Sequence, residues 1–183
     1  MVPAFAVWVT GLPASGKSAI TRAVVHELAA RGVDVAVLES DALREVVTPR
    51  ATYSDEERDA FYRTLTYIGA LLVKHGVPVI FDATANRRAY RGEARAAIDR
   101  FIEVYVECPL HVCMARDPKG VYRKACSGQA STVPGVQASY EAPEHPDVVV
   151  SGQSESPEAG AHAILRTLED KGYVTSQRVA ATP

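Results

Sequence analysis

An eight-residue segment, GLPASGKS from Gly11 to Ser18, combines two glycines, a lysine and a serine in the spacing G-x-x-x-x-G-K-[ST]. The glycines let the backbone curl so that its N–H groups point inward at phosphate oxygens. The segment lies between an apolar run typical of a strand and a helical pattern, which is the context this motif requires. The N-terminus of that helix adds a positive dipole end. We therefore expect a site for the phosphates of a nucleotide.

Within this P-loop, Lys17 is expected to reach the β- and γ-phosphates of ATP, and Ser18 to offer its hydroxyl to Mg²⁺. A glycine-rich turn that binds nothing is the alternative, and the register of strand and helix with the motif disfavours it. Ser18 is the predicted metal ligand. The residues predicted to hold ATP are Gly11, Leu12, Pro13, Ala14, Ser15, Gly16, Lys17, Ser18 and Ala19.

A second chemical group, in the run ESDALR, follows the next predicted strand, Asp34–Ser40. Ligands of an open parallel sheet bind at the carboxyl ends of its strands, so Asp41 and Arg44 are expected beside the P-loop. Asp41 is suited to accept a proton from an attacking hydroxyl or to hold the metal through water. A purely structural role for Asp41, as the N-cap of the following helix, is the alternative. Arg44 is suited to pair with an acceptor phosphate. We predict Asp41 and Lys17 as catalytic residues.

A third strand, Val77–Asp82, is apolar until it ends in an acid, and two arginines follow at positions 87 and 88. Three roles for Asp82 compete: holding Mg²⁺ through water, binding an acceptor hydroxyl, or orienting Arg88 or Arg91. We favour acceptor recognition or orientation over metal binding.

The composition bounds the protein class. With 183 residues, 47% hydrophobic and 23% charged, one soluble globular domain is expected. A net charge of −2 argues against a general nucleic-acid binder. No apolar run approaches membrane-spanning length, and the N-terminus does not read as a signal peptide. The three cysteines form no CxxC pair, so reduced thiols in a cytoplasmic protein are expected.

Strands alternate with helices along the chain, which predicts a parallel sheet with helices on both faces. The alternation breaks from about residue 117 to 146, in a stretch that holds Lys119, Arg123 and Lys124 together with three glycines and four prolines. Long irregular segments of this kind in compact domains are usually functional or disordered. We predict that this stretch is a lid over the phosphate site.

Two runs in this lid, ARDPKGVYRKACSG from Ala115 and YEAPEHPD from Tyr140, together with the P-loop and LESDALR, resemble the adenylylsulfate kinases. Those enzymes phosphorylate the 3′-hydroxyl of adenosine 5′-phosphosulfate with MgATP. The resemblance implies a P-loop NTPase fold with a five-stranded parallel sheet, helices on both faces and a lid loop. It also implies one kinase domain over residues 1–174, with the lid at about 117–146, a C-terminal tail over 175–183, and a homodimer.

The resemblance also implies site residues. Asp41 falls on the general base, and Arg44 and Arg58 fall on ligands of the sulfonucleotide. The predicted acceptor-binding residues are Arg44, Arg58, Asp82, Thr84, Asn86 and Lys119. The predicted lid cations are Arg116, Lys119, Arg123 and Lys124.

Several family positions are changed on the acceptor side. Phe61 stands where the family has an asparagine that touches the acceptor, and Val133 where it has a phenylalanine that stacks on adenine. Ala85 and Asn86 replace a Ser-Pro pair. Three functions are therefore weighed: an adenylylsulfate kinase, a kinase of the same scaffold with another nucleotide or small-metabolite acceptor, and a nucleotide-binding module without turnover. The first is our prediction, since a pure binder needs neither Asp41 nor a basic lid.

Overall fold

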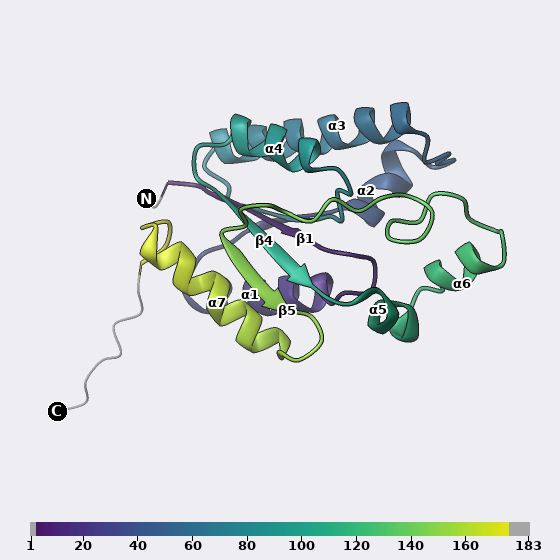
Figure 1. The fold of residues 1–183 in the computed structure, drawn as a ribbon. Coiled ribbons are helices and arrows are strands. Elements are labelled where there is room, and N and C mark those ends of the chain that lie inside the picture. Colours follow the sequence, from purple (N-terminus) through teal and green to yellow (C-terminus); the bar gives the residue numbers. More distant parts are fainter. Residues whose placement is uncertain (1–2, 176–183) are drawn as a thin grey trace.

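Strands and helices alternate along the chain in a layered α/β molecule (Figure 1). The computed structural model describes residues 3–175. Its strands are β1 (Ala6–Thr10), β2 (Ala36–Glu39), β3 (Val79–Asp82), β4 (Phe101–Glu107) and β5 (Val148–Ser151). Its helices are α1 (Lys17–Ala30), α2 (Ser40–Val47), α3 (Asp55–Lys74), α4 (Arg88–Ala97), α5 (Leu110–Arg116), α6 (Val121–Cys126) and α7 (Pro157–Asp170).

The five strands form one parallel sheet in the order β2-β3-β1-β4-β5. Helices α3 and α4 cover one face, and α1 and α7 cover the other (Figure 1). The predicted fold class is thereby confirmed. In the register, Asp82 lies level with Val9 of β1 and with Glu39 of β2. The carboxyl ends of these three strands therefore bring the P-loop, Asp82 and the start of α2 to one edge of the sheet.

Each face of the sheet has its own apolar core. Val7, Val24 and Ile164 belong to the core under α1 and α7. On the other face, Trp8 stacks on Phe81 with ring centroids 4.5 Å apart, beneath α3 and α4. A Cβ added to Gly69 of α3 would lie 2.1 Å from Cζ of Phe81, so this helix packs closely on β3 only because the position is glycine.

Local sequence signals set most helix ends. At the start of α3, Ser54 accepts a hydrogen bond from the Glu57 amide at 3.2 Å, and Ser156 caps α7 in the same way. The second strand is shorter than predicted, because Ser40 already begins α2. Glu39 occupies the N-cap position, so the interpretation of Asp41 as a helix cap is wrong.

The predicted lid is less irregular than expected, since it contains the short helix α6. It leaves α5 at the carboxyl ends of the strands and returns along the sheet edge before β5 (Figure 1). The predicted tail over 175–183 lies, apart from its first residue, outside the described part of the chain. Among residues 3–175, no helix is both long and apolar enough to span a membrane.

Candidate active site

The P-loop connects β1 to α1 and depends on its two glycines. A Cβ at Gly11 would lie 2.6 Å from the Val106 carbonyl oxygen, and Gly16 has a left-handed φ of 107°. No side chain caps α1, so the N–H groups of its first turn are left for a ligand. The loop therefore presents an anion cradle at the sheet edge.

Lys17 lies in the floor of this cradle. Its Nζ donates hydrogen bonds to the carbonyls of Gly11 and Leu12 at 3.1 and 2.9 Å. Burial lowers the pKa of Lys17, while the nearby carboxylates of Asp82 and Asp41 act in the opposite direction. A buried ammonium of this kind gains most when phosphate oxygens approach it.

A cavity of about 710 Å³ opens above the P-loop. It is bounded by the P-loop, the start of α2, the end of β3, and the lid. Outside the P-loop, the sequence predicts ten site residues. Eight of them line this cavity: Asp41, Arg44, Arg58, Asp82, Thr84, Arg116, Lys119 and Lys124. Asn86 and Arg123 do not belong to the lining, and the latter faces a separate shallow pocket beside Cys126.

Asp82 is buried at the end of β3 and lines the cavity. The interpretation that it orients Arg88 or Arg91 is wrong. Arg91 pairs with Glu103 and Arg88 with Glu144, and within residues 3–175 no ion pair joins Asp82 to an arginine. Binding a metal or an acceptor hydroxyl are the two roles that remain for this carboxylate.

Asp41 lies in the first turn of α2, exposed at the cavity mouth. The lid residue Lys119 reaches it, with Nζ 2.6 Å from Oδ2, and lies 4.0 Å from Glu39. This hydrogen bond raises the pKa of Lys119. Since both partners are exposed, the pair contributes little to stability, about 1 kcal/mol or less. It shows, however, that the lid lysine reaches the candidate base.

Arg44 projects from α2 into the far end of the cavity and is only 8% exposed. Its Cζ lies 3.8 Å from the ring centroid of Phe61 and 5.0 Å from that of Tyr53. Glu57 forms an ion pair with it at 3.5 Å. Hydrogen bonds from Thr52 hold the pKa of Glu57 below its usual value, so this carboxylate stays charged beside the guanidinium.

Arg58, on α3, is 6% exposed, and each of its three side-chain nitrogens donates one hydrogen bond to a neutral group, which leaves two N–H donors for a ligand. It donates to the carbonyls of Tyr53 at 3.1 Å and Thr132 at 2.6 Å, and to Oδ1 of Asn86 at 3.3 Å. Asn86 in turn donates to the Ser139 carbonyl. Asn86 thus lies behind the cavity, where it positions Arg58 instead of facing an acceptor.

These two buried guanidiniums have one carboxylate within ion-pair distance, Glu57 on Arg44, among the described residues. A buried charge without a counterion is costly. This end of the cavity is therefore built to receive an anion.

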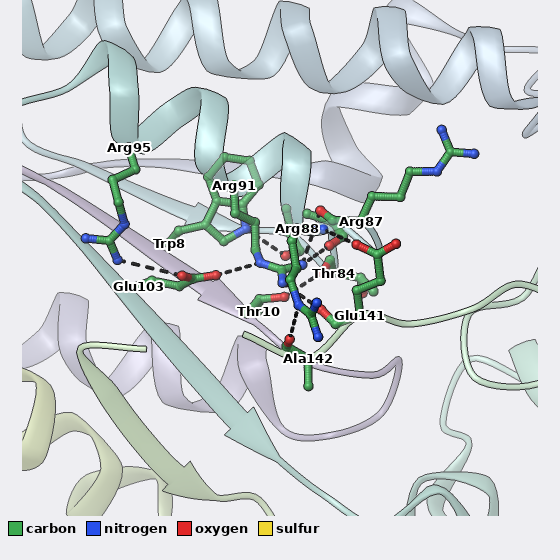
Figure 2. Close-up of polar contacts among 12 residues, drawn as sticks. Trp8, Thr10, Thr84, Arg87, Arg88, Arg91, Arg95, Glu103, Glu141 and Ala142 are labelled. Atoms are coloured by element: carbon green, nitrogen blue, oxygen red, sulfur yellow. Dashed lines mark hydrogen bonds and ion pairs between the residues drawn. The ribbon is translucent and has the colours of Figure 1, made fainter. Parts of the chain in front are cut away.

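A polar network missed by the sequence reasoning supports the acceptor end (Figure 2). Arg91, 1% exposed, donates to Glu103 at 2.6 Å, to the carbonyl of Glu141 at 2.6 Å and to that of Ala85. The backbone amide of Arg88 donates to the Glu141 carboxylate, and its Nε donates to the Ala142 carbonyl. The loop after β3 is thereby tied to the segment that returns from the lid. Arginines at positions 87, 88, 91 and 95 gave no signal of which one would be buried.

The cavity suits a magnesium ion bound together with a nucleotide. Within residues 3–175, no three His, Cys, Asp or Glu side chains converge on a metal cage. Mg²⁺ bound with nucleotides takes only one or two protein oxygen ligands, and phosphates and water supply the rest. The Ser18 hydroxyl and the Asp82 carboxylate are two oxygen donors that line the cavity near Lys17, and the Asp41 carboxylate is a third.

Comparison with known proteins decides the family. The family model for adenylylsulphate kinase matches residues 3–151. The chain belongs to the adenylylsulphate kinase family. A curated adenylyl-sulfate kinase of Myxococcus xanthus is 37% identical over 180 residues, covering 96% of this chain and 97% of the relative. The predicted resemblance is thereby confirmed, and with it a family of ATP-dependent phosphotransferases.

Two further matches place this adenylylsulphate kinase family member among its relatives. A Mycobacterium tuberculosis APS kinase, solved in complex with AMPPNP and APS, superposes with a TM-score of 0.86 at 31% identity, covering 92% of this chain and 99% of the other. A probable bifunctional SAT/APS kinase of Sorangium cellulosum is 38% identical over 176 residues, 96% of this chain but 30% of that protein. The same domain thus occurs alone and within a longer protein.

Proposed function

We propose that this chain transfers the γ-phosphoryl group of ATP to the 3′-hydroxyl of adenosine 5′-phosphosulfate, giving 3′-phosphoadenosine 5′-phosphosulfate, by direct in-line transfer. One observation carries the proposal: a single cavity joins a P-loop at one end to two buried, undercompensated guanidiniums at the other, with Asp41 on its lining. The family membership supplies the identity of the two nucleotides.

The donor nucleotide is held by the P-loop. The backbone N–H groups of the P-loop, all of its residues except Pro13, and the N-terminus of α1 receive the phosphates of ATP. Lys17 places its charge beside the transferred phosphoryl group. Ser18, with Asp82 as a second oxygen donor, would hold Mg²⁺, which when bound neutralises charge on the phosphate oxygens.

Asp41 acts as the general base in this proposal. Its carboxylate accepts the proton of the attacking 3′-hydroxyl as the bond from the 3′-oxygen to the γ-phosphorus forms, the bond from that phosphorus to the β,γ-bridging oxygen breaks, and ADP leaves. Lys119, 2.6 Å from Asp41, moves its charge to the phosphates when they arrive. Arg116 and Lys124 also line the cavity from the lid side, so a closed lid surrounds the transferred group with cations and excludes water.

The acceptor is held by the anionic end. Arg44 and Arg58 receive the phosphosulfate, and its negative charge compensates their buried positive charge. Thr84 lines the wall between Asp82 and this end. Val133, which lines the lid side, offers an apolar contact for the base in place of an aromatic ring.

The valine at position 133 supports a second candidate function. Base stacking on an aromatic side chain is worth about 1–3 kcal/mol, and Val133 does not supply it. A kinase of the same scaffold that accepts another nucleotide or small hydroxyl compound fits the cavity too. We further propose one kinase domain over residues 1–174, a cytoplasmic location, which rests on the three cysteines, and a homodimer, which rests on the resemblance alone.

The test is ADP release with MgATP, with and without adenosine 5′-phosphosulfate. We expect saturation by the sulfonucleotide with a KM in the usual range of about 1 μM to 1 mM. Asp41→Asn should lower kcat roughly 10²-fold or more while ATP binding is kept. Glu45→Gln, an exposed acid on the same helix, is the matched control and should leave kcat unchanged.

Two outcomes would redirect the proposal. ATP binding without stimulation by adenosine 5′-phosphosulfate would move the function to another acceptor. Equal losses of kcat and of ATP affinity in the Asp41 variant would make this carboxylate a metal ligand instead of a base.

A further inference from the structure

Phe61 contacts the guanidinium of Arg44 through the face of its aromatic ring. This residue of α3 is 1% exposed and does not belong to the cavity lining, so it does not reach an acceptor directly. The Arg44 Cζ atom lies 3.8 Å from its ring centroid, the contact distance of a guanidinium stacked flat on a ring. It is the shortest of the three ring–Arg44 distances, those to Tyr53 and Tyr62 being 5.0 and 5.9 Å.

The way in which Phe61 holds this charge matters for binding. A ring face attracts a guanidinium without accepting any of its N–H groups, whereas a polar side chain would occupy at least one. Within the described residues, Nη1 of Arg44 is buried and makes no hydrogen bond, and its ion pair with Glu57 is long at 3.5 Å. Phe61 therefore holds the Arg44 guanidinium while Nη1 keeps a donor without a hydrogen-bond partner among the described residues.

We propose that Phe61 is a positioning residue for acceptor binding: its ring fixes the guanidinium of Arg44 so that its edge donates to the 5′ anionic group of the acceptor. The proposal rests on the proposed function and adds a specificity device to it. The family's asparagine at this position contacts the acceptor directly, whereas Phe61 contacts the arginine that binds the acceptor. Acceptor affinity then depends on the electron density of a buried ring that the acceptor never touches.

The first test removes the ring and keeps the volume. Phe61→Leu should raise the KM for adenosine 5′-phosphosulfate by roughly tenfold, as expected for a buried cation–π contact, with kcat and the KM for ATP within about twofold. Arg44→Met should raise the same KM at least as much. The double variant should be no worse than Arg44→Met alone, because the ring acts only through this arginine.

A second test separates orientation from packing. Phenylalanine at position 61 is replaced by its mono-, di- and trifluoro analogues, which keep the ring shape and progressively remove the negative charge of its face. The KM for the acceptor should rise stepwise along this series. The same series at Phe81, a buried ring stacked on Trp8, is the control and should leave the KM flat. An acceptor KM that stays constant along the fluorine series at position 61 would overturn the proposal. A kcat that falls by the same factor as the KM rises would overturn it as well.

The inference and the proposed function fail separately. If the wild-type chain does not use adenosine 5′-phosphosulfate, the proposed function is wrong. The role of Phe61 is then tested with inorganic sulfate as the probe. Sulfate is titrated by calorimetry while AMPPNP occupies the P-loop. The sulfate dissociation constant should then weaken on Arg44→Met and along the fluorine series at position 61. A sulfate affinity that ignores both changes would reject the role of Phe61.

Discussion

The donor and acceptor ends of the cavity are built from contacts of very different range. At the donor end, Lys17 bonds the carbonyls of Gly11 and Leu12, only six and five residues away. At the acceptor end, Arg58 bonds Asn86 and Thr132, 28 and 74 residues away. One end is a local turn of the backbone, and the other exists only when α3, the loop after β3 and the lid have come together.

This difference explains which changes each end tolerates. The donor end needs glycines and a lysine at fixed spacing, and it binds groups common to all nucleoside triphosphates. The acceptor end relies on side chains fixed by other side chains, so its specificity can shift through residues such as Phe61 that never touch a ligand. Phe61, Asn86 and Val133, where the sequence analysis expects departures from the family, all belong to this end or to the lid beside it.

The largest effect is expected at the donor end. Lys17→Met should lower turnover about 10²–10³-fold, because it removes a buried charge beside the transferred phosphoryl group. The fold should be kept: burial lowers the pKa of Lys17, so the empty protein gains little from this charge, and the variant should melt no lower than the wild type. ADP release and thermal melting measure the two quantities. Lys74→Met, an exposed lysine on α3, is the control.

Near-normal turnover in the Lys17 variant would contradict the assignment of the donor end itself. A large drop in melting temperature would show instead that the two carbonyl hydrogen bonds of this lysine hold the loop together.

The sequence predicted the donor end well because its signals are local. The motif, the strand before it and the helix after it lie within some 25 residues, and the order of strands and helices followed from periodicity. Arg44 was placed by its position after the second strand and by resemblance, and Arg58 by resemblance alone. The buried position of Arg91 and the pairing of Asn86 with Arg58 were not predictable, because each depends on which of many similar polar groups becomes its neighbour in the folded chain.

The error over Asp82 has the same origin. Two arginines follow it closely in sequence, yet parallel strand pairing places Asp82 beside β1 and the P-loop, while the guanidiniums of Arg88 and Arg91 turn toward Glu144 and Glu103. Proximity along the chain was a poor guide to proximity in space.

An intermediate effect is expected from breaking the long-range contacts of Arg58. Arg58→Met should raise the KM for adenosine 5′-phosphosulfate about 10- to 100-fold, since hydrogen bonds to charged groups are worth about 1.5–3 kcal/mol. Asn86→Ala should raise it less, because the guanidinium is kept but loses one of its three anchors. The KM for ATP should stay unchanged in both. Arg63→Met, exposed on the same helix, is the control.

The double variant with Arg58→Met and Asn86→Ala tests whether Asn86 acts through Arg58. If Asn86 acts only by positioning Arg58, the combined KM change should equal that of Arg58→Met alone. Additive changes would mean that Asn86 touches the acceptor after all, as the sequence had suggested. A rise in the KM for ATP would show that the two ends of the cavity are not separable.

The smallest effect on activity is expected at Asp147, at the far edge of the polar network behind the acceptor end. Its carboxylate accepts from the Glu103 amide at 2.8 Å, from Arg95 at 2.7 Å and from Lys171 at 3.0 Å. Arg95 also approaches Glu103, the partner of Arg91 (Figure 2). Burial opposes the charge of Asp147, yet these three donors outweigh it and hold its pKa below the usual value.

Asp147→Asn should therefore cost stability more than activity, by about 1–3 kcal/mol at pH 7, with kcat and both KM values within about twofold. A carboxylate with a lowered pKa stabilises the fold above its unfolded pKa, near 3.9. This contribution is lost as the pH falls through the folded pKa, so the melting curves of variant and wild type should converge below about pH 3.9. Asp99→Asn, at an exposed aspartate between α4 and β4, is the control and should show no such convergence. A raised KM for the acceptor in the Asp147 variant would instead mean that the long-range contacts of the acceptor end extend across the sheet to its opposite edge.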